Sequence, residues 1–177
     1  MKSVQRSIRD EVVHIHPSPQ SLLDIGCGNG FFTQVLAHSL PHTAITAVDL
    51  TLPRNPAGLN GIRFVEGGVE NLPFDSNLFD VVTASMSMHH WNNKEQGITE
   101  IYRVLKEGGR MVIGDPLLQD WLSNPFLGRL VQKIDGGVFA VPQELRAYLE
   151  SAGFEAVSIQ VVPHSLKSVY LITATKP

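Results

Sequence analysis

The sequence has a single cysteine, Cys27, among its 177 residues, which excludes a disulfide framework and favours a cytoplasmic location. It has no basic run, and its formal net charge is -3, so it lacks the positive charge that nucleic-acid binding usually requires. No apolar stretch approaches the roughly 20 residues of a membrane span, and residues 1–9 lack the apolar core of a signal peptide. We therefore expect one globular domain, residues 1–177, that neither crosses a membrane nor binds nucleic acid.

Several catalytic signatures are also missing. The chain has no P-loop sequence and no serine in a nucleophile elbow. No group of histidines has metal-ligand spacing with acidic or cysteine support, so no metal site is expected. Cys27 lies between glycines and is interpreted as a small turn residue in preference to a nucleophile.

The chain is organised around residues 22–30, where a mostly apolar run meets three glycines at alternate positions: Gly26, Gly28 and Gly30. Helical spacing of apolar residues follows, so the pattern predicts a buried strand, a tight turn and a helix start. Glycine is needed where φ is positive or where the backbone approaches a ligand closely. The free N–H groups at a helix start are polar and partly positive. This turn is therefore a candidate cradle for a nucleotide-like ligand.

Strands and helices are expected to alternate along the chain. Strands are predicted at residues 21–25, 44–48, 62–66, 79–84, 111–113, 154–162 and 168–175, and helices at 3–15, 30–39, 94–105 and 142–152. Alternation of this kind predicts an α/β fold with a doubly wound, mostly parallel seven-stranded sheet and helices on both faces. A short loop joins the last two strands, so that pair should be antiparallel.

Three segments carry more local predictions. The helix over residues 94–105 should be closed by Gly108 and Gly109, a usual C-terminal stop. Residues 50–61 contain too many prolines and glycines for a full helix. Residues 117–141 are less regular and are expected to form a partly helical insertion, which is a candidate lid.

Asp49 follows the second predicted strand, 19 positions after Gly30. That distance suits an acidic residue that accepts hydrogen bonds from ribose hydroxyls, and the alternative is a cap or turn residue. The dinucleotide fingerprint requires a third glycine where this chain has Phe31, which argues against a nicotinamide or flavin enzyme.

With these motifs in place, the sequence resembles the class I S-adenosylmethionine-dependent methyltransferases, in particular the small-molecule group that includes the ubiquinone and menaquinone biosynthesis type. The stretches that carry the resemblance, in family order and spacing, are residues 22–30, 47–50, 70–74, 79–82, 89–91 and 103–110. They extend over roughly residues 20–115 and are specific for the family but not for a substrate. The resemblance implies a Rossmann-like fold, with S-adenosylmethionine as the cofactor and S-adenosylhomocysteine as its product.

The resemblance also implies a set of cofactor-binding residues. They are Asp24, Gly26, Cys27, Gly28, Gly30, Asp49, Leu50, Gly68, Val69 and Ser85. Asp24 would help to hold the methionine end, Asp49 the ribose hydroxyls, and Leu50 the adenine. The family often has an acidic residue where this chain has Gly68, so that carboxylate is missing, although the N–H of Val69 could serve the adenine ring.

Methyl transfer requires mainly that acceptor and methyl group are aligned. An oxygen or carbon acceptor often also needs a base. His89 and His90 follow the fourth strand, Asp115 ends the fifth, and these strands are neighbours in the fold that the resemblance implies. An imidazole and a carboxylate could therefore act together as a base. The alternative is that residues 89–91 only position their loop.

The main hypothesis is a methyltransferase for a small, apolar molecule, with an O-, C- or N-acceptor left open. Apolar residues in 117–141 suit a pocket lid, an ordinary core or a dimer surface. Residues 84–87 lack the Asn/Asp-Pro-Pro-Tyr-like motif, which weighs against DNA adenine and protein glutamine as acceptors. The alternative is a non-catalytic protein that binds S-adenosylmethionine or S-adenosylhomocysteine. Monomer and homodimer both stay open.

Overall fold

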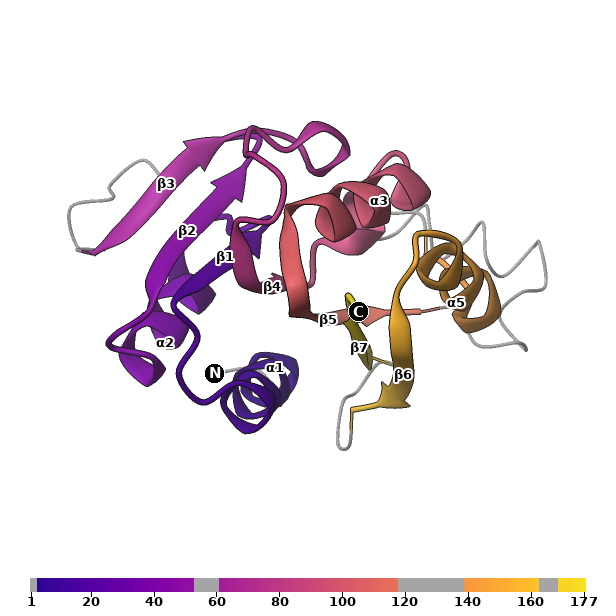
Figure 1. The fold of residues 1–177 in the computed structure, drawn as a ribbon, viewed down its shortest axis with the longest axis horizontal. Helices are drawn as coiled ribbons and strands as arrows, with labels where there is room; N and C mark the ends of the chain where they lie inside the picture. Colours follow the sequence, from indigo (N-terminus) through magenta and orange to yellow (C-terminus); the bar gives the residue numbers. More distant parts are fainter. Residues whose placement is uncertain (1–2, 53–60, 118–138, 163–168) are drawn as a thin grey trace.

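The computed structural model describes residues 3–52, 61–117, 139–162 and 169–177 (Figure 1). Most of the segments 50–61 and 117–141 lie outside the described residues, so the predictions made for them stay predictions. The elements are α1 (Ser3–Ile15), β1 (Ser21–Ile25), α2 (Phe31–Ser39), β2 (Ala44–Asp49), β3 (Ile62–Glu66), η2 (Val69–Asn71), β4 (Phe79–Ser85), η3 (Met88–His90), α3 (Lys94–Val104), β5 (Leu105–Pro116), α5 (Pro142–Ser151), β6 (Glu155–Val161) and β7 (Val169–Thr175).

The seven strands form one sheet in the order β3-β2-β1-β4-β5-β7-β6. The first five strands pair in parallel, whereas β7 runs antiparallel to both β5 and β6. The predicted α/β class, the parallel core and the antiparallel end of the sheet are thereby confirmed. The strand order reverses between β1 and β4, and sheets of this kind bind ligands beyond the carboxyl ends of the strands at such a point.

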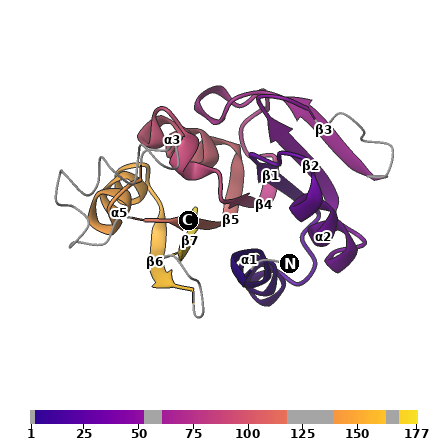
Figure 2. The ribbon, with the colours of Figure 1, turned by 180° about the vertical axis from the view of Figure 1, so that it is seen from behind.

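Helices cover both faces of the sheet, with α1 and α2 on one side and α3 and α5 on the other (Figures 1 and 2). Because successive strand residues point to opposite faces, adjacent residues belong to different cores. Leu22 and Val81 pack in the cluster under α1 and α2, while their neighbours Leu23 and Val82 pack under α3 and α5. Strands buried on both faces explain the near-continuous apolar runs in the sequence.

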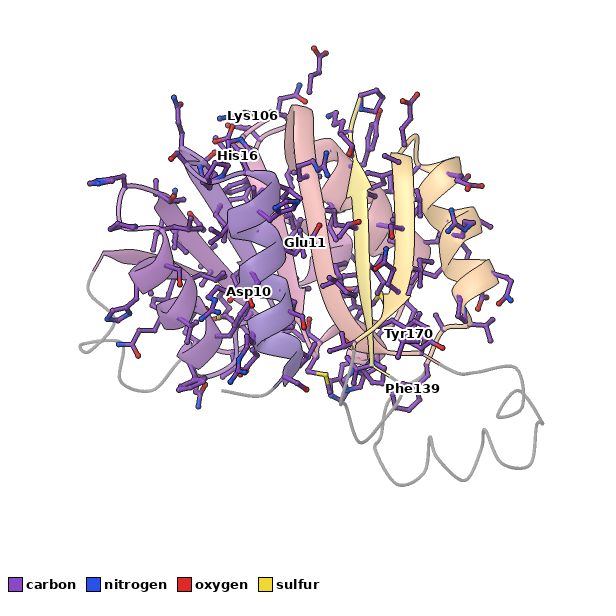
Figure 3. The ribbon with its side chains drawn as sticks, turned by 90° about the horizontal axis from the view of Figure 1, so that it is seen from below. Asp10, Glu11, His16, Lys106, Phe139 and Tyr170 are labelled. Atoms are coloured by element: carbon purple, nitrogen blue, oxygen red, sulfur yellow. The ribbon has the colours of Figure 1, made fainter. Side chains whose placement is uncertain are left out.

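The N-terminal helix α1 lies directly against β5 (Figure 3). It buries Val4, Ile8 and Val12, which are one helical turn apart and form a single stripe. A Cβ on Gly114 of β5 would lie 2.4 Å from Cγ2 of Val4 and 2.7 Å from Cδ1 of Ile8. A residue without a side chain is therefore what allows this close approach of helix and strand.

One predicted boundary is wrong. Helix α3 ends at Val104, and Gly108 and Gly109 lie within β5, which begins at Leu105 and not near residue 111. The helix needs no glycine cap because the ammonium of Lys176 donates to the carbonyl oxygens of Tyr102 and Leu105, at 2.9 and 2.8 Å. A cation can satisfy the last carbonyls of a helix in this way.

The glycines serve the strand instead. Leu105 pairs with Phe79, and the ladder resumes at Arg110 after a shift of register. Gly108 has a φ of 74°, which suits an irregularity of this kind.

Candidate active site

A cleft of about 310 Å³ lies at the carboxyl ends of the parallel strands. This volume is at the lower end of the range of small-molecule sites, about 300–1,000 Å³. Its lining comes from the ends of β1 and β2 and from the segments that follow β3 and β4. The lining residues are Ile25, Gly26, Gly28, Val48, Asp49, Leu50, Gly67, Gly68, Val69, Glu70, Met86, Ser87, His90, Trp91 and Asn92.

The glycine turn forms one end of the cleft. Gly26 and Gly28 have φ values of 70° and 55°, in the left-handed region that favours glycine. A Cβ on Gly26 would lie 2.4 Å from Cβ of Ser87, so this glycine also lets the segment after β4 approach the turn. Apart from its two chain neighbours, no described residue has an atom within 4 Å of the position that a Cβ on Gly28 would take, so this part of the turn faces open space.

Asp49, at the end of β2, joins the glycine turn to the rest of the cleft. Its Oδ2 accepts the N–H of Gly28 at 2.7 Å, and its Oδ1 accepts the N–H of Thr51 at 3.2 Å. Each carboxylate oxygen has two lone pairs, so both oxygens can accept a further hydrogen bond from a ligand hydroxyl. Leu50 follows with 73% of its side chain exposed and lines the cleft beside Asp49.

Two of the expected cofactor residues, Asp24 beneath the glycine turn and Cys27 within it, are buried and do not line the cleft. Asp24 is buried and accepts hydrogen bonds from the hydroxyls of Thr33 (2.6 Å) and Thr83 (3.0 Å). Its burial raises its pKa from 3.8 to about 6. Burial also raises the pKa of the Cys27 thiol to about 12, so this thiol is neutral at physiological pH.

Gly30 and Ser85 also lie outside the lining. Gly30, with a φ of 77°, is the N-cap residue of α2, and its N–H donates to the carbonyl of Cys27. The Oγ of Ser85, at the end of β4, is buried without a hydrogen-bond partner among the described residues. A buried hydroxyl without a partner is costly, so a polar ligand group could be held there.

The carboxyl ends of β4 and β5 bring the predicted base residues together. Asp115 is fully buried, and its Oδ1 lies 2.9 Å from Nδ1 of His89. It also accepts the backbone N–H groups of Met88 and His89, at 2.9 and 3.2 Å. Burial raises the pKa of Asp115, and the hydrogen bonds and charge of His89 oppose that rise.

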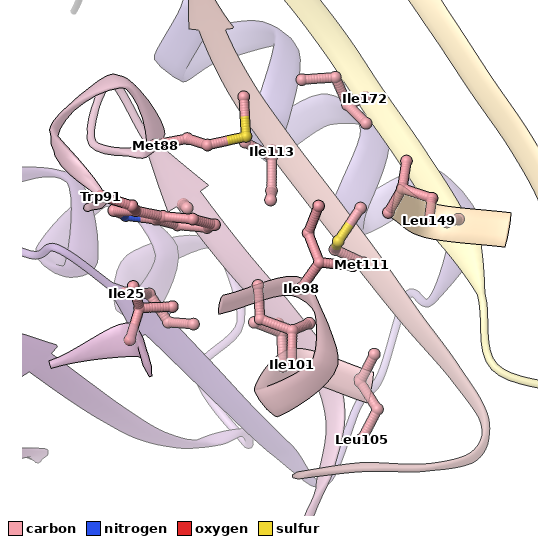
Figure 4. Close-up of a cluster of buried hydrophobic side chains, with 14 of the residues drawn as sticks. Ile25, Met88, Trp91, Ile98, Ile101, Leu105, Met111, Ile113, Leu149 and Ile172 are labelled. Atoms are coloured by element: carbon pink, nitrogen blue, oxygen red, sulfur yellow. The ribbon is translucent and has the colours of Figure 1, made fainter. Parts of the chain in front are cut away.

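His89 and His90 have different environments. The ring of His89 is 8% exposed and is stacked on Phe139 at 5.3 Å between centroids, close to the carboxyl edge of the sheet (Figure 3). His90 is exposed and lines the cleft, and the two imidazole rings are 4.0 Å apart. Trp91 lines the cleft on one side and packs into the core on the other, next to Met88 (Figure 4).

The sequence analysis missed about half of the lining: Ile25, Val48, Gly67, Glu70, Met86, Ser87, Trp91 and Asn92. All of them follow or end a predicted strand, so the strand-end rule could have indicated their place, although not their role. Ser87, whose hydroxyl donates to the carbonyl of Ile25, could not be distinguished from an ordinary loop serine.

A second cavity of about 200 Å³ adjoins the cleft at Asn92. The starts of α3 and α5 provide its charged side chains, among them Lys94, Glu95 and Glu144, and Phe139 provides an aromatic wall. Burial lowers the pKa of Lys94, and the charges of Asp115, Glu144 and Glu70 partly offset this effect. Phe139, on which His89 is stacked, thus also lines this second cavity.

Within the described ranges, no three His, Cys, Asp or Glu side chains are grouped as metal ligands would be. No helix among the same residues has the length and apolar character needed to span a membrane.

The fold and the cleft define a Rossmann-like α/β protein whose glycine turn and Asp49 line a cleft at the carboxyl ends of the parallel strands. The chain belongs to the methyltransferase domain family, whose model matches residues 23–113, and within it to the class I group that uses S-adenosylmethionine.

Relatives and a solved structure agree with this assignment. The chain is 31% identical over 145 residues to 2-methyl-6-phytyl-1,4-hydroquinone methyltransferase 1, chloroplastic, from Oryza sativa subsp. japonica, covering 78% of this chain and 42% of the relative. It is 24% identical over 188 residues to demethylmenaquinone methyltransferase from Bacteroides fragilis, covering 89% of this chain and 76% of that one.

Among solved structures, the fold resembles 1,6-didemethyltoxoflavin-N1-methyltransferase from Burkholderia thailandensis, crystallised with S-adenosylhomocysteine. The TM-score is 0.75 at 23% identity, over 98% of this chain and 78% of that one. The chain spans less than half the length of the rice relative.

Proposed function

We propose that this chain transfers the methyl group of S-adenosylmethionine to a small, largely apolar acceptor that carries a phenolic hydroxyl, of the hydroquinone kind. The observation that carries the proposal is the cleft in which the glycine turn and the Asp49 carboxylate meet, with Gly28 N–H and Asp49 Oδ2 at 2.7 Å. The names of the rice and Bacteroides relatives support an aromatic quinol as the class of acceptor.

The residues of the cleft fit this cofactor. The open space at Gly28 leaves room for a ligand against the backbone, and Asp49 has lone pairs for ribose hydroxyls. The buried hydroxyl of Ser85 is a candidate partner for the polar methionine end. When bound, S-adenosylmethionine supplies a methyl group that its sulfonium already activates, so the protein has mainly to orient the acceptor and accept a proton.

Asp115 and His89 are suited to accept that proton. If Nδ1 of His89 carries its hydrogen towards Asp115, Nε2 is left as an acceptor. The buried carboxylate then stabilises the imidazolium that forms when the acceptor hydroxyl loses its proton to Nε2. His90, at the cleft surface, is the alternative base, and its ring contacts that of His89.

The test combines binding with turnover. Calorimetric titration should show binding of S-adenosylmethionine and S-adenosylhomocysteine but not of NAD, and a panel of substituted hydroquinones should be methylated. Binding of NAD without binding of S-adenosylmethionine or S-adenosylhomocysteine would contradict the proposal. Cofactor binding without turnover of any hydroquinone would favour the non-catalytic alternative.

The base is tested by His89→Gln and His90→Gln. General-base catalysis contributes about 10²–10⁴-fold, so the variant that removes the base should lose at least about 100-fold in methyl transfer. Cofactor affinity should be unchanged in the same variant, because neither imidazole is expected to hold the cofactor. Rates equal to that of the unaltered protein in both variants would remove the base assignment.

We further propose a cytoplasmic location, which the single unpaired cysteine supports.

A further inference from the structure

The part of the cleft on the far side of Asp49 from the glycine turn has no ligand group assigned to it so far. If Asp49 holds the ribose, the glycine turn lies on one side of it and Leu50, Gly68, Val69 and Glu70 on the other. Leu50, which is exposed, offers apolar surface for a flat ring, whereas the side chain of Val69 is buried against Gly97 of α3. Among the described residues, Glu70 is the only one with a charged side chain in that part of the lining.

The two oxygens of the Glu70 carboxylate have different roles. Oε1 accepts the backbone N–H groups of Asn92 and Asn93, at 2.9 and 3.3 Å, and so ties η2 to the start of α3. Oε2 makes no such hydrogen bond to the described residues and is 3.5 Å from the position that a Cβ on Gly68 would take. One oxygen is thus anchored, and the other lies above Gly68.

The absence of a side chain at Gly68 leaves this space to its neighbours. A Cβ there would be 3.3 Å from Cδ2 of Leu50, so the tips of Leu50 and Glu70 both approach Gly68. Gly68 itself has φ -97° and ψ 152°, an extended conformation open to any residue. The glycine is therefore not required by the backbone, and what it provides is room.

We propose that Glu70 determines the base specificity of the cofactor site, with Oε2 accepting a hydrogen bond from the exocyclic amine of adenine. This inference rests on the proposed function, since it requires an adenosyl cofactor with its ribose at Asp49. An ionised carboxylate only accepts hydrogen bonds, so it selects a base with an amino group over one with a carbonyl oxygen at the same position.

The anchored geometry makes Glu70→Gln a sharp test. The two N–H groups of Asn92 and Asn93 hold the amide oxygen of the glutamine at the position of Oε1, so its NH₂ group takes the position of Oε2. A donor then faces the base where an acceptor had been. The probes are S-adenosylhomocysteine and its deaminated form, S-inosylhomocysteine, which has a carbonyl oxygen in place of the amine.

Calorimetric titration of both probes should show an exchange of preference. The unaltered protein should bind S-adenosylhomocysteine at least about 10-fold more tightly than S-inosylhomocysteine, as expected for one charge-assisted hydrogen bond. Glu70→Gln should weaken S-adenosylhomocysteine about 10-fold and bring S-inosylhomocysteine to equal or tighter binding. The double variant Gly68→Asp/Glu70→Gln places a new carboxylate at residue 68, whose Cβ position is 3.5 Å from Oε2 of Glu70. This carboxylate should restore the preference for adenine.

Glu66→Gln is the matched control, because Glu66 is an exposed carboxylate at the end of β3 that does not line the cleft. It should leave both affinities unchanged. Thermal unfolding without ligand should be nearly the same for Glu70→Gln and the unaltered protein, since the anchoring oxygen is kept.

Three outcomes would overturn the inference. Equal affinities of the unaltered protein for the two probes would do so without any variant. Parallel weakening of both probes in Glu70→Gln would show that Glu70 only anchors the segment after β4. If the unaltered protein bound neither probe, the proposed function would fail as well, and this result is distinct from the first two.

Discussion

Two buried carboxylates support opposite sides of the site. Asp24, in β1, lies beneath the glycine turn and is held by the neutral hydroxyls of Thr33 and Thr83. Asp115, in β5, lies beneath the segment after β4 and is held by an imidazole and two backbone N–H groups. Burial raises the pKa of both, but only Asp115 has a partner that can become a cation.

The difference separates a packing role from a chemical one. Two hydroxyl donors only partly offset the cost of a buried charge, so the pKa of Asp24 is raised to about 6 and no neighbouring side chain takes up a charge with it. Asp115 orients a ring that can exchange a proton, and at the same time holds the backbone that carries this ring. We therefore expect the β4–β5 side to be the more sensitive of the two to substitution.

Asp115→Ala should have the largest effect. It removes the acceptor of Met88 N–H, His89 N–H and His89 Nδ1 at once, in a place without access to water. Removal of one partner of a buried pair costs about 3–5 kcal/mol, so the free energy of unfolding in urea at pH 7 should fall by that amount. Asp115→Asn, which keeps one acceptor oxygen, is the control and should lose less. If Asp115→Ala lowered the free energy of unfolding by less than about 1 kcal/mol, the β4–β5 side would not be the more sensitive of the two.

Asp24→Asn should change the pH dependence of stability. The unfolded carboxyl titrates at 3.8 and the folded one at about 6, so between these values the folded state keeps a proton that the unfolded state has lost. Raising the pH through this window therefore lowers the free energy of unfolding, by about 3 kcal/mol for a shift of this size, and no further change follows above pH 6–7.

The asparagine variant lacks this titration. The stability of the unaltered protein minus that of Asp24→Asn should fall by about 3 kcal/mol between pH 4 and pH 7 in urea unfolding. Asp115 titrates in both proteins, so its contribution cancels in the difference. Parallel pH curves would show that the carboxylate is solvated, or that its hydrogen bonds fully offset its burial.

Within the glycine turn, Gly26→Ala and Gly28→Ala form a matched pair. Both put a side chain at positive φ, which costs about 1–2 kcal/mol. Only the Cβ at Gly26 would also meet Ser87, and overpacking of this kind adds about 1–3 kcal/mol. Chemical denaturation should rank Gly26→Ala as the less stable variant, while Gly28→Ala should weaken S-adenosylhomocysteine in calorimetry with a smaller loss of stability. Equal stability of the two would contradict the close contact at Ser87.

The smallest effect is expected from Phe139→Leu. The variant keeps an apolar side chain but removes the ring stacked on His89 at 5.3 Å. Aromatic pairs contribute about 0.5–1.5 kcal/mol beyond their buried area, so a double-mutant cycle with His89→Gln should give a coupling energy in that range. A coupling energy near zero would mean that the stack does not hold the imidazole, and that Asp115 alone orients it.

Much of the fold could be predicted because local signals agreed with the tertiary structure. Asn77 takes a φ of 57° before β4, and Gly153 a φ of 101° after α5, as expected for a turn residue and a helix end. The end of α3 was predicted to within one residue, but the glycine pair assigned as its stop was wrong, because the side chain that satisfies its last carbonyls, Lys176, is about 70 residues away in the sequence. No local pattern can indicate a cap that only the folding of β7 against β5 brings into place.

The sequence by itself determined the order of strands and helices, the glycine turn and the acidic residue at the end of β2, because each depends on periodicity or on backbone conformation over a few residues. The tertiary structure decided what shares the site. It placed Asp24 beneath the turn and paired Asp115 with His89. It also set Glu70 at the edge of the cleft, with one oxygen anchored and one free. These relations join segments about 10 to 30 residues apart, and only packing in three dimensions brings them within hydrogen-bond distance.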